Sequence, residues 1–242
     1  MPDMLSIGFE SEAFAEQAEM LGKRLGLEVD NVHEPRLCIG ESGLSLKFPG
    51  FSPVFADFEK SRRRVLHNRG GQDALIRACR PAPGVRIVDA TAGWGRDAAV
   101  LASLGAQVTM IEQNPVMHAL LEDALQRSSL QENLSLVQGE AGEWLTQLES
   151  EVPPDVIYLD PMHPVRQKSA LVQKDMQILQ QLVNKQPNPH AVLAIAISRA
   201  KRSVVVKWPQ KSPPLAEPTS RIPGKTVRFD VYAGLGRMLI KE

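Results

Sequence analysis

From residue 74 onward, short apolar stretches alternate with amphipathic ones, and this alternation constrains the fold of the chain more than any other feature. The pattern predicts strands at 85–89, 107–111, 134–137, 156–159, 203–208 and 227–233. Between them it predicts helices at 96–104, 115–127, 170–183 and 191–198, although the last run is apolar enough to fit a strand as well. Such alternation is typical of an α/β fold, in which helices cover both faces of a mainly parallel sheet. Ligands of such sheets bind beyond the carboxyl ends of the strands.

The first part of the chain has a different pattern. Apolar residues at helical spacing predict a helix over 11–25 that ends at Gly26. A hairpin follows, with strands at 36–39 and 44–48. We therefore expect a small α+β subdomain over residues 1–60 and the main domain over residues 61–242.

Composition excludes several classes of protein. The longest apolar run, 191–197, is much shorter than the roughly 20 residues that a membrane helix needs. The N-terminal sequence lacks the basic and apolar regions of a signal peptide. Two cysteines cannot form a disulfide scaffold or a zinc site by themselves. We expect a cytoplasmic protein without a metal, with a monomer as the expected oligomeric state.

The net charge of zero conceals a strong segregation of charge along the chain. Residues 81–160 contain 3 basic and 12 acidic residues, whereas residues 161–242 contain 14 basic and 4 acidic ones. The short segment 61–80 adds six arginines and one aspartate. This asymmetry indicates a polyanionic partner, with ordinary surface solvation as the alternative.

Two glycines follow the first predicted strand of the main domain, in the run D-A-T-A-G-W-G-R-D at 89–97. Gly93 and Gly95 permit a tight turn and a close approach of the backbone to a ligand. Glu112 ends the next strand, where its carboxylate can accept hydrogen bonds from both hydroxyls of a ribose. These features predict a site for a nucleoside-containing cofactor, with an ordinary strand-to-helix turn as the alternative.

The charges at this turn distinguish two cofactors. Residues 93–98 match the G-x-G-x-x-A fingerprint of dinucleotide-binding enzymes, so an NAD-dependent oxidoreductase is an alternative function. A pyrophosphate at a helix N-terminus disfavours nearby carboxylates, however, and Asp89 and Asp97 flank the glycines. S-adenosylmethionine has no phosphate and carries an ammonium and a sulfonium. We therefore predict S-adenosylmethionine as the cofactor.

A second motif, Y-L-D-P-M-H-P at 158–164, follows the fourth strand of the main domain. It resembles the D/N-P-P-Y/F/W motif of methyltransferases that act on amino groups. Methylation of an exocyclic amine requires acceptors for its N–H groups, and the Asp160 carboxylate and the Pro161 carbonyl are suited to this. His163 occupies the position where an aromatic residue normally stacks on the base. We expect these three residues to be catalytic, with a plain Asp-Pro turn as the alternative.

Together these motifs resemble the RsmJ family of bacterial small-subunit rRNA guanine-N2-methyltransferases. The resemblance covers roughly residues 55–235 and includes E-Q-N-P at 112–115, Q-K-S-A-L-V at 167–172, V-V-V-K-W-P at 204–209 and R-F-D-V-Y-A-G at 228–234. It implies a class I S-adenosylmethionine-dependent methyltransferase fold that acts on 16S rRNA. It also implies cofactor contacts at Arg96, Asp97, Glu112, Gln113, Glu140, Ala141 and Asp160. Many relatives carry Phe where this chain has His163, a difference that affects base stacking.

Glu140 has two possible roles. It follows the third strand of the main domain, where such enzymes hold the adenine amino group, and its carboxylate can accept that hydrogen bond. It can equally be a solvated charge at the start of a helix.

The basic residues supply a candidate surface for rRNA or the small ribosomal subunit. We expect this surface to include Arg62, Arg63, Arg64, Arg166, Lys168, Lys207 and Lys211. For the arginine run, a solvated helix face is the alternative. A non-catalytic RNA-binding module also fits the basic surface, but the complete set of carboxylates and glycines disfavours it.

Overall fold

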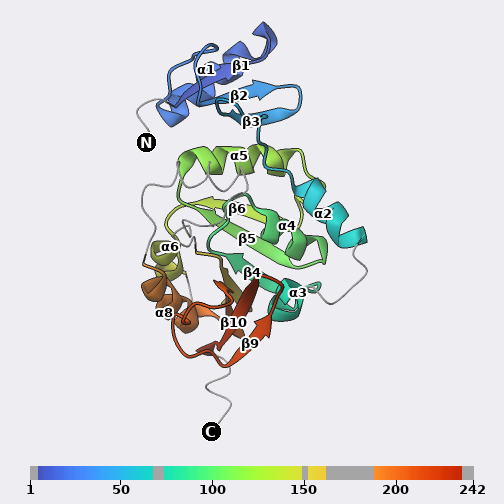
Figure 1. Ribbon diagram of the computed structural model, residues 1–242, viewed down its shortest axis with the longest axis vertical. Coiled ribbons are helices and arrows are strands. Elements are labelled where there is room, and N and C mark those ends of the chain that lie inside the picture. Colours follow the sequence, from blue (N-terminus) through green and yellow to red (C-terminus); the bar gives the residue numbers. More distant parts are fainter. Residues whose placement is uncertain (1–4, 68–73, 149–151, 162–187, 236–242) are drawn as a thin grey trace.

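The main body of the protein is a seven-stranded sheet covered by helices on both faces. The computed structural model describes residues 5–67, 74–148, 152–161 and 188–235. The strands lie in the order β6-β5-β4-β7-β8-β10-β9, and the first five in this order run parallel to one another (Figure 1). Their bounds are β4 Arg86–Asp89, β5 Gln107–Glu112, β6 Leu134–Gln138, β7 Val156–Leu159, β8 Ser203–Pro209, β9 Ser220–Pro223 and β10 Val227–Ala233. The predicted mainly parallel sheet is therefore confirmed.

Six helices accompany this sheet in the described part of the chain. They are α2 Phe58–His67, α3 Ala74–Cys79, α4 Arg96–Ser103, α5 Pro115–Gln126, α6 Ala141–Gln147 and α8 Pro189–Arg199. The side chains of Asn114 and Asn188 cap α5 and α8, each directly before a proline at the first helical position. The ambiguous run 191–198 is thus helical, as predicted. The helix expected at 170–183 lies outside the described residues.

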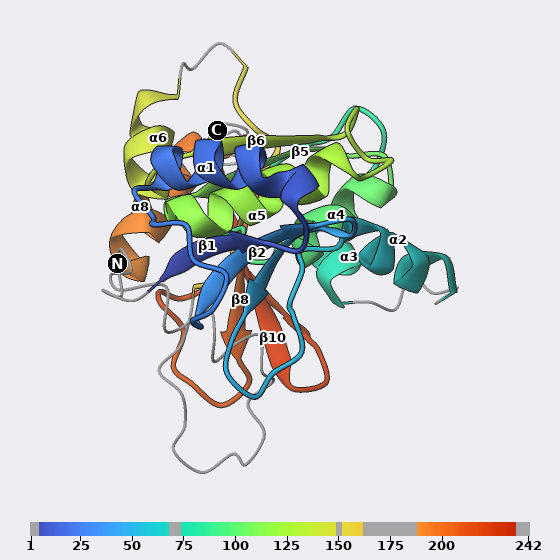
Figure 2. The same ribbon diagram turned by 90° about the horizontal axis from the view of Figure 1, so that it is seen from above.

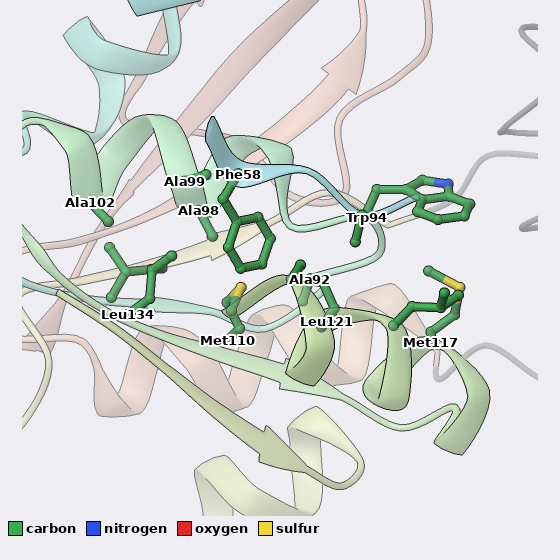
Figure 3. Packing of buried hydrophobic residues seen from close by; sticks show 14 of the residues in the cluster. Phe58, Ala92, Trp94, Ala98, Ala99, Ala102, Met110, Met117, Leu121 and Leu134 are labelled. Carbon is green, nitrogen blue, oxygen red and sulfur yellow. The ribbon is translucent and has the colours of Figure 1, made fainter. Parts of the chain in front are cut away.

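The two faces of the sheet form two separate cores because successive residues of a strand point in opposite directions. On β7, Val156 and Tyr158 face α4 and α5, while Ile157 and Leu159 face α6 and α8. The first core continues to α2, whose Phe58 ring packs among Ala98, Met110 and Leu121 (Figure 3). The alternation therefore determines which side of the sheet each strand-end residue can reach.

A small three-stranded sheet packs on the outer side of α5 (Figures 1 and 2). It contains β1 Ser6–Phe9, β2 Arg36–Gly40 and β3 Gly43–Lys47, with η1 Glu12–Phe14 and α1 Ala15–Leu25 between the first two. The predicted helix and hairpin are both present, and Gly26 ends α1 with a φ of 67°. The predicted domain boundary at residue 60 lies within α2. No described helix is long and apolar enough to cross a membrane.

Candidate active site

The carboxyl ends of β4, β5, β7 and β8 bring the candidate residues of the main domain to one edge of the sheet. Asp89 ends β4 and Glu112 ends β5, and Asp160 follows β7 directly. Leu159 of β7 pairs with Val206 of β8, so Asp160 and Lys207 come next in register. This is the edge at which parallel sheets bind ligands.

The glycine turn wraps around the end of β4 and is held by Glu112. Gly93 and Gly95 have φ values of 52° and 68°, in the left-handed region that favours glycine. Gly95 is also restricted by packing, because a Cβ there would come within 2.5 Å of the Phe58 ring. Glu112 accepts hydrogen bonds from the backbone N–H of Gly93 (3.2 Å) and of Asn114 (2.8 Å). Its carboxylate therefore joins the turn before α4 to the turn before α5.

Burial shifts the proton affinity of both strand-end carboxyls. Asp89 is 1% exposed and accepts a hydrogen bond from the Thr91 N–H. Burial raises the pKa of Asp89 to about 8, and the negative charges of Asp97 and Asp160 contribute to this rise. The hydrogen bond from the Thr91 N–H and the positive charge of Lys207 act in the opposite direction but are weaker. Burial likewise raises the pKa of Glu112 to about 7, against the backbone donors that favour its ionised form. The buried Asp89 carboxyl thus holds the backbone at the start of the glycine turn through the Thr91 N–H.

Asp97, Tyr158, Asp160 and Lys207 form a hydrogen-bonded cluster above Asp89. Lys207 Nζ lies 2.9 Å from Asp97 Oδ2 and 2.7 Å from Asp160 Oδ2. The Tyr158 hydroxyl donates to Asp97 Oδ2 at 2.6 Å, and Thr91 Oγ1 accepts from the Asp160 N–H at 2.6 Å. This cluster connects the first turn of α4 to the start of the D-P-M-H-P run.

The observed contacts of Lys207 differ from those that we expected. The sequence analysis assigned it to the RNA-facing surface, whereas here it bridges two carboxylates inside the candidate site. The reason is the alternation of β8, because Lys207 lies on the same face as Val205, which packs in the core beneath α4. Tyr158 and Thr91 are members of this site that the sequence analysis missed, and for Lys207 it missed the contacts with the two carboxylates. Strand periodicity was the signal for Lys207 and Tyr158.

Glu140 lies at the start of a helix, as one of its two expected roles required. Its Oε2 accepts the backbone N–H of Glu143 at 2.8 Å and so caps α6. Its Oε1 is buried and has no hydrogen-bond partner among the described residues. Ala141, the first residue of α6, is buried beside it. An open groove of about 410 Å³ runs from Glu140 between α6 and α8, on the opposite face of the sheet from Lys207.

The remaining predicted residues are distributed more widely. Gln113 follows Glu112 at the same edge, Arg96 is exposed at the start of α4, and Pro161 is partly buried after Asp160. His163, Arg166, Lys168 and the side chain of Arg64 lie outside the described residues. Lys211 is exposed in the loop after β8, at the same edge as Asp160.

The structure separates Arg62 and Arg63 from this edge. Arg62 donates to Ser129 Oγ at 3.2 Å and pairs with Glu59. Ser129 precedes β6, at the amino ends of the parallel strands. The arginine run was expected on the RNA-facing surface, but its described residues Arg62 and Arg63 lie away from the carboxyl edge, and the small subdomain packs on α5.

Methyltransferases are among the known proteins to which this chain is similar. Residues 20–234 match the model of a family described as "Putative SAM-dependent methyltransferase". Ribosomal RNA small subunit methyltransferase J of Legionella pneumophila is 46% identical, over 94% of this chain and 95% of that protein. The protein of the same name from Thioalkalivibrio sulfidiphilus is 42% identical, over 94% and 97%.

Among solved structures, a SAM-dependent methyltransferase from Neisseria gonorrhoeae is similar with a TM-score of 0.74. It is 29% identical, and the match covers 98% of this chain and 99% of that one. The likeness therefore extends over both the small sheet and the seven-stranded sheet.

Proposed function

Since this chain belongs to the ribosomal RNA small subunit methyltransferase J family, we propose that it transfers a methyl group from S-adenosylmethionine to the exocyclic N2 amine of a guanosine in 16S rRNA. Membership of this family of S-adenosylmethionine-dependent methyltransferases replaces the alternative of an NAD-dependent oxidoreductase. The observation that carries the proposal is the position of Asp160, directly beside the glycine turn and at the edge where the cofactor residues meet.

The chain offers a donor set that fits S-adenosylmethionine. Glu112 provides carboxylate oxygens for the ribose hydroxyls, beside a turn whose backbone can approach a ligand closely. The buried Glu140 Oε1, without a partner in the described part of the chain, suits the adenine amino group. Asp97 supplies negative charge for the cationic end of the cofactor. When bound, S-adenosylmethionine supplies a methyl group activated by its sulfonium.

Asp160 provides the chemistry at the nitrogen. Its carboxylate accepts one N–H of the amine and the Pro161 carbonyl accepts the other, so that the nitrogen lone pair is directed at the methyl carbon. Transfer of the methyl group would leave the electron pair of the broken C–S bond on sulfur and a positive charge on the methylated nitrogen. Asp160 then takes one proton from the nitrogen. Because its side chain is 36% exposed, it can pass that proton to water.

The RNA partner implies further properties of the chain. We place the substrate at the carboxyl edge, where exposed Lys211 stands beside the candidate site. Arg166 and Lys168 follow the catalytic segment in sequence and belong to the same proposed surface. An enzyme of ribosomal RNA acts in the cytoplasm, and we propose that this one works as a monomer.

A methyl-transfer assay tests this proposal. Purified protein is incubated with S-adenosylmethionine labelled in its methyl group and with 16S rRNA, either free or in small subunits isolated from cells lacking this protein. We expect labelled RNA with the wild type and a loss of at least 100-fold in rate with Asp160→Asn, which keeps the shape of the side chain but lacks the charge. Isothermal titration should show that both proteins bind S-adenosylmethionine. Wild-type protein that neither binds the cofactor nor labels RNA would refute the proposal.

A further inference from the structure

Lys207 is placed by the fold at the centre of the candidate site. It is the one charged residue in the apolar strand β8, between buried Val206 and Trp208. Its side chain is 27% exposed, and its Nζ contacts carboxylates on two different elements, α4 and the end of β7. Placing a lysine in such an apolar strand costs free energy unless its ammonium is paired with a carboxylate.

The surroundings of Lys207 are strongly acidic. Asp89 from β4, Asp97 from α4 and Asp160 after β7 all face it, together with the hydroxyl of Tyr158. Burial raises the pKa of the Cys79 thiol in α3, and the nearby carboxyls of Asp97 and Asp89 add to this rise while Arg202 opposes it. Among the groups that the structure describes here, Lys207 is the cation that contacts both Asp97 and Asp160. It therefore offsets the mutual repulsion of the carboxylates.

The contacts also define the orientation of Asp160. Lys207 engages Oδ2, while the Thr91 hydroxyl fixes the backbone N–H of the same residue. Asp160 is thus held from two sides, and Oδ1, the carboxylate oxygen that Lys207 does not engage, is the candidate acceptor for an incoming N–H group.

We propose that Lys207 is the positioning residue of this enzyme, which keeps Asp160 ionised and aims its Oδ1 at the amine of the substrate. This inference rests on the proposed function for the identity of that amine, but the ionisation of Asp160 belongs to the protein alone. Lys207 acts through Asp160 and does not touch the reacting atoms. A carboxylate paired with lysine is a weak base, yet it suffices here because the methylated nitrogen is a strong acid before it loses its proton.

Charge balance predicts what removal of Lys207 does. In the wild type, burial raises the pKa of Asp160 above its usual value, Lys207 opposes that rise, and Asp97 adds to it. Burial alone would lower the pKa of Lys207, but Asp160 and Asp97 raise it above its usual value, so the lysine stays charged. Without the ammonium of Lys207, the pKa of Asp160 should rise further. As the pH is lowered, the Asp160 carboxylate should then become protonated at a higher pH than in the wild type.

The test compares Lys207→Met with Lys207→Arg, which keeps the charge. Lys225→Met, at an exposed position between β9 and β10, is the matched control. The pH dependence of kcat is measured at saturating substrates. We expect the acid limb of Lys207→Met to move up by at least one pH unit and its kcat at neutral pH to fall at least 10-fold. Lys207→Arg should keep the wild-type limb, and Lys225→Met should match the wild type.

A second measurement does not depend on activity. The titration of the Asp160 carboxyl carbon is followed by NMR in wild type and in Lys207→Met, with the signal assigned through Asp160→Asn. An Asp160 midpoint at least one pH unit higher in Lys207→Met supports the inference, even if the RNA substrate is a different one. An unchanged midpoint overturns it, as does an unchanged acid limb in an active enzyme. Should Lys207→Met fail to fold, Lys207→Gln serves for the same comparison.

Discussion

At the scale of single residues, the site uses similar carboxylates in very different surroundings. Asp89 is 1% exposed and serves the turn, whereas the side chain of Asp160 is 36% exposed and paired with Lys207. The motifs placed both Asp89 and Asp160 in the candidate site. They did not show that one is buried under the turn and the other partly exposed, because burial depends on what packs above each strand end. The missed role of Lys207 has the same origin.

Asp89 should make the stability of the fold depend on pH. In the unfolded chain this carboxyl is ionised above about pH 4, but in the folded protein its pKa is about 8. The folded state therefore holds the proton more tightly, and this contribution to stability is present at low pH and lost as pH rises to 8. The loss approaches about 1.4 kcal/mol per pH unit between those values.

Urea unfolding of wild type and Asp89→Asn at pH 5, 6, 7 and 8 measures this effect. Asparagine keeps the acceptor for the Thr91 N–H. The difference in the free energy of unfolding, wild type minus Asp89→Asn, should fall steadily as the pH rises from 5 to 8. A constant difference would show that Asp89 is ionised in the folded protein throughout this range.

Glu112→Gln should weaken cofactor binding. The substitution removes the negative charge and replaces one acceptor oxygen with a donor, which opposes either the Gly93 or the Asn114 N–H. Hydrogen bonds to charged groups are worth about 1.5–3 kcal/mol, so the Kd for S-adenosylmethionine should rise about 10- to 100-fold. Isothermal titration gives the value directly, and a Kd equal to that of the wild type would remove Glu112 from the cofactor site.

At the scale of elements, the loop after β8 is held by a buried ion pair on β10. Arg228 and Asp230 share one face of β10, and the guanidinium contacts both carboxylate oxygens, at 2.8 and 3.0 Å. The same guanidinium donates to the carbonyls of Pro209, Gln210 and Ser212. The loop that follows Lys207 is therefore fixed to the sheet by a side chain from the next strand but one along the chain.

Arg228→Met should destabilise the protein by about 3–5 kcal/mol, because it removes the close partner of buried Asp230 and leaves only Arg221 at 3.8 Å. Asp230 is 0% exposed. Arg221→Met is the control, since Arg221 also approaches Asp230 but is 47% exposed and should cost about 1 kcal/mol or less. Both changes are measured by urea unfolding. Equal midpoints for wild type and Arg228→Met would contradict a structural role for the pair.

The elements that the sequence predicted are those with strong local signals. The strands β4, β5, β7 and β8 are short apolar runs, and α5 and α8 begin with Asn-Pro caps. In contrast, β1 has four residues and becomes a strand by pairing with β2, and β9 does so by pairing with β10. Short α6 contains glycine and threonine and depends on its Glu140 cap. The partner of β1 is distant in sequence, whereas β9 and α6 depend on a neighbouring strand and a capping side chain, and periodicity shows none of these contacts.

At the scale of the whole molecule, the small subdomain and the candidate site use different surfaces. The subdomain is joined to α5 by the Arg24–Glu122 pair at 2.7 Å, and Arg127 of the same region donates to the Ala56 carbonyl at 3.0 Å. The candidate site, at the carboxyl edge of the large sheet, lies on a different surface from these contacts. The charge segregation in the sequence indicated a polyanionic partner but did not show which edge it would meet.

The two ends of β8 allow a test of the RNA-facing edge. Lys211 follows β8 at the carboxyl edge, and Lys201 precedes it at the amino edge, with both exposed. Each phosphate contact contributes about 0.7–0.9 to the slope of log binding constant against log salt. Lys211→Ala should therefore lower the magnitude of the slope for 16S rRNA by about that amount, whereas Lys201→Ala and Arg63→Ala should leave it unchanged. A slope altered by Lys201→Ala alone would place the RNA at the opposite edge.

Nucleoside mass spectrometry of 16S rRNA tests the central claim most directly. The rRNA is isolated from cells that lack this protein and from the same cells supplied with the wild type or with Asp160→Asn. The proposed reaction predicts that one N2-methylguanosine is missing in the deletion, is restored by the wild type and stays missing with Asp160→Asn. An unchanged content of N2-methylguanosine in the deletion, or its full restoration by Asp160→Asn, would contradict it.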